Sequence, residues 1–243
     1  MRRTRTLVAL LGAAALTMAA IAPASADSAA SYTVTISNLT DGQPFTPPLA
    51  ASHRPAVDLF EVGEPASEAI KEIAENGNLG PAVAFATESS SAKHIADAVV
   101  ALPDEGPPPI LPGESRTFTL TSSNGANLFS WASMLICTND GFVGIDSVRL
   151  PKQVGDRISL TADAYDAGTE INTEDLADIV PPCQGLTGVE DDMGAPGTGM
   201  SDLLLAEGGV IASHPGIDGV ADLLVGLHGW TDPVATVVIT RDS

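Results

Sequence analysis

The run of residues 128–136 is almost entirely apolar, and no other feature of the sequence restricts the fold as strongly. A strand that is covered on both faces has this pattern, because neither set of its alternating side chains meets water. The run is followed by Cys137-Thr138-Asn139-Asp140, whose polar and acidic residues favour a turn. We therefore expect a central buried strand that ends in an acidic turn.

Residues 31–38 and 115–121 alternate between apolar and polar residues, as half-buried strands do. Residues 157–164 and 233–240 are also expected to form strands. The 23 glycines and 18 prolines predict many turns, and apolar residues at 44% allow a sizeable core. Together these features predict a mainly β fold, an antiparallel β-sandwich with long loops.

One helix is clearly signalled. Pro65 and the acidic residues around it suit a first helical turn, an apolar stripe follows, and Gly77 fits a helix stop. For residues 80–100 we expect a strand near 82–86 and then a second short helical piece. The fold class therefore includes one or two short helices.

The first 26 residues have the pattern of a secretory signal peptide. Three arginines precede an apolar stretch, and Ala24-Ser25-Ala26 provides a cleavage site. We expect cleavage before Asp27, a single mature domain over residues 27–243, no membrane span and a secreted product. An uncleaved anchor is the alternative, but it needs about 20 apolar residues.

The charge balance is strongly acidic. The leader holds three of the 11 basic residues and no acidic one, so eight basic residues oppose 31 acidic residues in the mature chain, which carries −23. Nucleic acids are recognised through basic patches, so we expect no nucleic-acid partner. The charge favours cations, basic partners or simple solubility.

The two cysteines, Cys137 and Cys183, both lie in the exported part. An oxidising compartment makes a single disulfide the expected state, and it would close a loop of about 47 residues with a stabilisation of roughly 4 kcal/mol. A zinc site is the weaker interpretation, because no CxxC or HxxxH spacing accompanies these cysteines.

Two acidic segments carry the candidate site: Asp140-Gly141-Phe142-Val143-Gly144 and Asp166-Ala167-Gly168-Thr169-Glu170. We interpret both as turns that follow strands, where carboxylates and carbonyls provide the six to eight oxygens that Ca²⁺ takes. Backbone capping by the aspartates is the structural alternative. Asp146 is a possible fourth ligand, but a strand-entry hydrogen bond suits it better.

The order of these motifs resembles the spondin N-terminal domain family, an extracellular module that also occurs in exported bacterial proteins. The resemblance covers most of residues 31–175. It is carried by five segments: Ala51-Ser52-His53, residues 65–77, Ser133-Met134-Leu135, residues 139–147 and residues 165–170.

The resemblance implies a sandwich of about eight antiparallel strands, similar to the C-two-type modules, with a calcium ion on a loop edge. The family's metal ligands fall here on Asp140, Asp166 and Glu170. At the last position the family often carries aspartate. Glutamate is one methylene longer and still binds Ca²⁺.

Relatives in animals serve in adhesion and matrix organisation, so the resemblance implies a monomeric, non-enzymatic recognition module that binds an extracellular protein or glycan. Two alternatives stay open. A secreted hydrolase would need two carboxyls that face each other across a cleft. A purely structural secreted protein would use the metal only to rigidify its loops. The four histidines show no ligand spacing, and no nucleophile motif is present.

Overall fold

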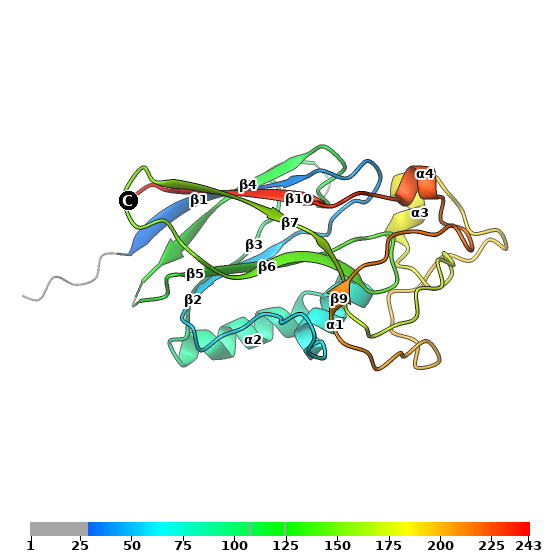
Figure 1. The fold of residues 1–243 in the computed structure, drawn as a ribbon, viewed down its shortest axis with the longest axis horizontal. Coiled ribbons are helices and arrows are strands. Elements are labelled where there is room, and N and C mark those ends of the chain that lie inside the picture. Colours follow the sequence, from blue (N-terminus) through cyan, green and yellow to red (C-terminus); the bar gives the residue numbers. More distant parts are fainter. Residues whose placement is uncertain (1–28, 107, 124) are drawn as a thin grey trace, which may run out of the picture.

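The computed structural model describes residues 29–106, 108–123 and 125–243. The predicted signal peptide, residues 1–26, lies outside the described residues. The described chain forms two antiparallel sheets packed face to face, with strand orders β4-β1-β10-β7 and β3-β2-β5-β6-β8-β9 (Figure 1). The predicted antiparallel β-sandwich is therefore confirmed.

Ten strands and four short helices make up the described part of the chain. In order they are β1 (Ala30–Asn38), β2 (Leu49–His53), α1 (Glu68–Asn76), α2 (Gly80–Ser91), β3 (Ile95–Val100), β4 (Ser115–Ser122), β5 (Leu128–Met134), β6 (Gly141–Arg149), β7 (Arg157–Ala162), β8 (Ala164–Asp166), α3 (Pro182–Thr187), β9 (Ala212–Ser213), α4 (Val225–His228) and β10 (Ala235–Arg241).

The first and last strands pair in the middle of the four-stranded sheet. Tyr32 lies opposite Arg241, and Asn38 lies opposite Ala235. Along β1 buried and half-buried residues alternate strictly, as the sequence pattern predicts. The C-terminal strand is thus an integral part of the sandwich, although it lies beyond the long loop-rich segment that forms one end of the molecule (Figure 1).

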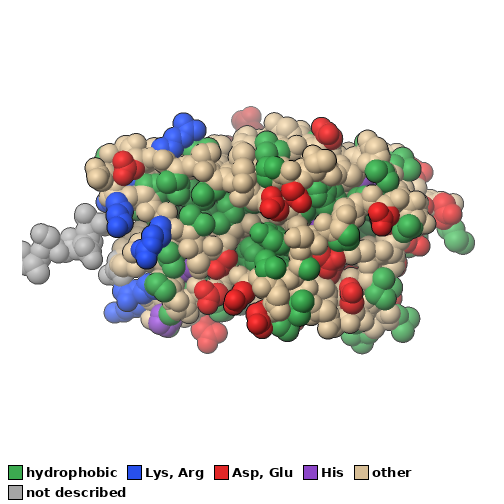
Figure 2. Space-filling model, in the orientation of Figure 1, with side chains coloured by type: hydrophobic (Ala, Val, Ile, Leu, Met, Phe, Trp, Pro, Cys, Tyr) green, Lys and Arg blue, Asp and Glu red, His purple; other side chains and the backbone are tan. Residues whose placement is uncertain are grey.

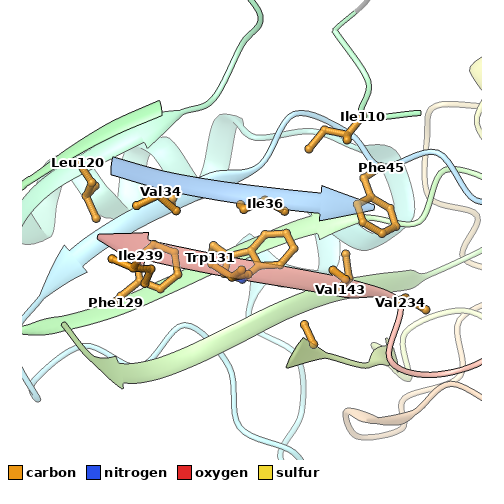
Figure 3. Packing of buried hydrophobic residues seen from close by; sticks show 14 of the residues in the cluster. Val34, Ile36, Phe45, Ile110, Leu120, Phe129, Trp131, Val143, Val234 and Ile239 are labelled. Carbon is orange, nitrogen blue, oxygen red and sulfur yellow. The ribbon is translucent and has the colours of Figure 1, made fainter. Parts of the chain in front are cut away.

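Strand β5 lies between β2 and β6 in the larger sheet, and all seven of its residues are buried. Phe129 and Trp131 point into the space between the two sheets, where they join residues such as Val34, Ile36 and Ile239 (Figure 3). On the other face of β5, Ala132 and Met134 pack in a second apolar cluster that includes residues of α1. The prediction of a doubly covered central strand is therefore confirmed.

Helix α1 begins and ends as its sequence indicates. Ser67 is the N-cap, and its Oγ accepts a hydrogen bond from Ile70 N at 3.3 Å. Gly77 ends the helix in the left-handed conformation, with φ of 61°. Ile70 and Ile73 are fully buried. These contacts fix α1 against the outer face of the larger sheet (Figure 1).

Two local predictions are wrong. Residues 80–91 form helix α2 and residues 95–100 form strand β3, the reverse of the expected order. Pro81 suits a first helical turn, and β3 pairs with β2 at the sheet edge. Residues 141–144 belong to strand β6 rather than to a turn, because they pair with β5 and β8.

The disulfide between Cys137 and Cys183 is present, with both residues fully buried. It joins the end of the β5 region to helix α3. Gln43 supports this junction: Cys137 N donates to Gln43 Oε1 at 3.1 Å, and Gln43 Nε2 donates to Cys137 O at 3.1 Å. No described helix has both the length and the apolar character needed to cross a membrane.

Candidate functional site

The turn between β5 and β6 is closed by Thr138. Its Oγ1 donates to Leu135 O at 2.7 Å and accepts from Gly141 N at 2.9 Å. A Cβ on Gly141 would lie 2.5 Å from that same Oγ1, so the tight turn requires glycine there. The turn directs Asp140 inward, and its side chain has no exposed surface.

Asp140 does not cap its own turn. Its Oδ2 accepts hydrogen bonds from Thr169 N at 2.7 Å, from Glu170 N at 3.0 Å and from Thr169 Oγ1 at 3.2 Å. Its Oδ1 is buried and has no hydrogen-bond partner in the described chain. Asp140 therefore joins the two acidic segments and keeps one oxygen free, at a cost in desolvation.

The second acidic segment is a tight turn after β8. Asp166 Oδ1 accepts from Gly168 N at 2.7 Å, which is the local capping bond that the structural alternative predicts. Its Oδ2 accepts from Asn172 Nδ2 at 2.6 Å. Gly168 has φ of +67°, and a Cβ there would lie 2.6 Å from Val210 N and O. The later chain thus packs directly on this turn.

Glu170 is 4% exposed, and its Oε1 accepts from Asp202 N at 3.0 Å. Burial, together with the nearby Glu75 and Asp140, raises the pKa of Glu170 to about 7, although the hydrogen bond from Asp202 and the charge of Lys71 oppose this rise. Burial and then Asp166 raise the pKa of Asp140 to about 6, although hydrogen bonds from Glu170 and Thr169 oppose this rise. The structure therefore gathers acidic groups whose charges are unfavourable without a compensating cation.

The ligand atoms of Asp140, Asp166 and Glu170 do not all lie within 4.8 Å of one another. Within the described ranges, one purely acidic cluster meets that criterion: Asp175, Asp191 and Asp222. This cluster is not predicted from the sequence, where the acidic run at 190–192 is its only local signal. Backbone N–H groups already hold these side chains, for example Ala195 N on Asp191 Oδ1 at 2.6 Å and Leu176 N on Asp222 Oδ2 at 3.0 Å.

Asp146 points away from Asp140. Its Oδ1 accepts from Leu59 N at 2.7 Å and from Ser130 Oγ at 2.8 Å. His53 Nε2 lies 2.7 Å from the same Ser130 Oγ. A serine, a histidine and an aspartate meet here, but Ser130 lies between His53 and Asp146, so the histidine is not oriented by the aspartate. Ser130 is also only 2% exposed. This network joins β2, β5 and β6 rather than presenting a nucleophile.

The sandwich fold, the buried disulfide and the acidic segments define a disulfide-bonded β-sandwich module. The Spondin_N family matches residues 36–174, which is more than half of the chain and includes both acidic segments. The chain therefore belongs to the Spondin_N family. No curated protein matches the sequence.

Beside the site, His214 gives a prediction about pH. It is 7% exposed, its Nδ1 accepts from Gly216 N at 3.0 Å, and its ring meets Trp230 edge-on at 5.0 Å. Burial lowers its pKa from 6.5 to about 4, and the carboxylates of Asp166 and Glu174 only partly oppose this. The folded protein thus holds a neutral imidazole at pH values where the unfolded chain is protonated.

This difference contributes a loss of roughly 3 kcal/mol in the free energy of unfolding as the pH falls from about 6.5 to 4. The raised pKa values of Asp140 and Glu170 act in the opposite direction over the same interval, so the contribution of His214 is measured as a difference between variants. Urea unfolding in chelator at pH 7 and pH 4.5 measures it. His214→Asn, which keeps an acceptor oxygen, should lose less stability over this interval. The exposed His94→Asn should behave like the wild type. Equal losses in all three proteins would contradict the prediction.

Proposed function

We propose that this protein is an exported, calcium-binding recognition module without catalytic activity, and that Asp140, Asp166 and Glu170 hold the ion. The observation that carries the proposal is the free, fully buried Oδ1 of Asp140, an anionic oxygen that lacks any partner in the described chain. A hard cation that prefers oxygen ligands suits such a position.

The residues of the site would each have a defined task. Asp140 Oδ2 holds the backbone of the second turn, which leaves Oδ1 for the cation. Two ligands at the usual Ca²⁺–oxygen distance lie at most about 5 Å apart. Because the ligand atoms of these three residues do not all lie within 4.8 Å of one another, we expect binding to involve a side-chain rotation or a bridging water molecule. A bound ion would supply the positive charge that the site lacks.

A recognition module fits the described surface better than a hydrolase does. One groove of about 690 Å³ is lined mainly by prolines and aliphatic residues such as Met134, Ile136 and Leu186, and none of its described lining residues is acidic. Asp140 and Glu170 are buried rather than set across a cleft. Paired carboxylates for glycan hydrolysis would have to face a substrate.

The charge distribution bears on the partner. Figure 2 shows Lys and Arg side chains gathered toward one end of the visible face, with acidic side chains spread over the remainder. A net charge of −20 for the whole chain disfavours polyanions such as nucleic acid. We propose that a monomer binds an extracellular protein or glycan in an adhesion-type contact.

Calorimetric titration of the mature, chelator-stripped protein tests the calcium site. We expect a saturable signal near one Ca²⁺ per chain, a much weaker response to Mg²⁺, and no saturable signal in an Asp140→Asn/Asp166→Asn variant. Asp222→Asn is the matched control from the other acidic cluster and should bind like the wild type. Loss of binding in the control alone would place the ion at Asp175, Asp191 and Asp222.

The function is tested separately from the metal. A pull-down from extracellular material, with and without chelator, should recover a partner only in the presence of calcium. A protein that binds calcium but recovers no partner would be a purely structural secreted protein. Release of sugars in glycan-hydrolysis assays would instead support the hydrolase.

A further inference from the structure

Two buried carboxylate oxygens lack a hydrogen-bond partner in the described part of the chain. One is Asp140 Oδ1, and the other is Glu75 Oε1. Glu75 belongs to helix α1, which lies far from both acidic turns in the sequence. It is 4% exposed, so its charge is withdrawn from water almost as completely as that of Asp140.

The other oxygen of Glu75 is occupied. Oε2 accepts a hydrogen bond from Ser201 Oγ and lies 4.0 Å from Lys71 Nζ. These contacts fix the orientation of the carboxylate, so that Oε1 is the oxygen that stays unpaired. The side chain of Lys71 is 32% exposed, and its single positive charge can balance only one of the negative charges of Glu75, Asp140 and Glu170.

The loop after residue 200 places Glu75 beside the site. Ser201 contacts Glu75, and the backbone N–H of the next residue, Asp202, donates to Glu170 Oε1 at 3.0 Å. The negative charges of Glu75 and Asp140 also raise the pKa of Glu170. Glu170 is therefore close enough to interact electrostatically with both carboxylates that each keep a free oxygen.

Burial alone does not explain these free oxygens, as Glu174 demonstrates. It is also buried, at 5% exposure, yet Asp218 N donates to its Oε1 at 2.6 Å. Gly219 N and Val220 N donate to its Oε2 at 2.6 and 2.9 Å. This fold therefore satisfies a structural carboxylate with backbone donors. Asp140 and Glu75 keep an oxygen that a cation would satisfy.

We propose that Glu75 is a further carboxylate of the cation site and contributes its Oε1 to the ion. The inference rests on the proposed calcium function and adds a residue from outside the two turns. A cation bound in this way joins helix α1 to the ends of β5 and β8, so that binding stabilises the outer helical layer as well as the turns.

Titration of chelator-stripped Glu75→Gln with Ca²⁺ tests the role of Glu75, with Glu72→Gln as the control on the same helix and with the same charge change. Glu72 Oε2 accepts hydrogen bonds from Asn78 Nδ2 at 2.7 Å and from Asn76 Nδ2 at 3.4 Å, so both of these partners are amides of the helix end rather than carboxylates of the site. We expect Glu75→Gln to bind Ca²⁺ at least tenfold more weakly and the control to match the wild type. Melting in chelator checks folding, and Glu75→Gln should melt close to the wild type, because glutamine keeps an acceptor for Ser201 and the lost contact with Lys71 at 4.0 Å is offset by removal of a buried negative charge.

Glu75→Asp, which keeps the charge but is one methylene shorter, provides a second variant and should show an intermediate loss of affinity. Wild-type affinity in both Glu75 variants would overturn the role of Glu75 while leaving the calcium site in place. Absence of calcium binding in the wild type would overturn the proposed function and this inference together. The two failures are therefore distinguishable.

Discussion

Replacing both cysteines with alanine is expected to lower the free energy of unfolding by about 4 kcal/mol, because an unfolded chain without the cross-link gains the entropy of a loop of roughly 47 residues. The bond between Cys137 and Cys183 encloses Asp140, Asp166 and Glu170 in that loop. Its loss should therefore weaken the structure that carries the site as well as the whole fold.

Urea unfolding in chelator measures this effect without a contribution from bound calcium. Wild-type protein unfolded under reducing conditions is the matched control and should lose a similar amount, since it lacks the same cross-link but keeps both side chains. A loss below about 1 kcal/mol in the variant would show that the unfolded chain is already restrained in this region.

Gly144→Ala is expected to destabilise the protein by about 3 kcal/mol, the upper part of the usual range for overpacking a core. Gly144 lies opposite Ala132 where β6 pairs with β5. A Cβ there would lie 2.5 Å from the carbonyl oxygen of Trp131 and 3.1 Å from Phe60 Cε1. Because the nearer atom is backbone in a central strand, the sheet itself would have to shift.

Gly185→Ala is the control for this substitution. Gly185 lies in α3, and an added Cβ would meet no atom within 4 Å. Alanine favours a helix over glycine, so this variant should be neutral or slightly more stable. Thermal unfolding of the two variants compares them directly. Similar melting temperatures would mean that the β5–β6 contact relaxes without cost.

The elements that the sequence predicts well are those with strong local signals. Strand β1 has strict alternation, β5 has a continuous apolar run, and α1 has both an N-cap and a C-terminal glycine. The single pair of cysteines left one possible intramolecular disulfide. In each case the pattern that makes the element stable is contained within a few neighbouring residues or a unique pair.

The stretch from 80 to 100 shows where local signals fail. Its alanines, valines and serines suit a helix or a strand almost equally, so pairing with β2 decides that residues 95–100 are the strand. Residues 141–144 read locally as a turn because of two glycines, yet their pairing partners on β5 and β8 make them part of β6.

The acidic residues of both turns could be picked out from the sequence, because motif order and oxygen chemistry mark them locally. The contacts that they make could not, because Asp140 binds the backbone of residues about 30 positions away. Glu75 lies within residues 65–77, which read as a helix, and the cluster of Asp175, Asp191 and Asp222 has only the acidic run at 190–192 as a local signal. Their environments arise only when distant segments pack together and exclude water, and that exclusion determines which carboxylate oxygen is left without a partner.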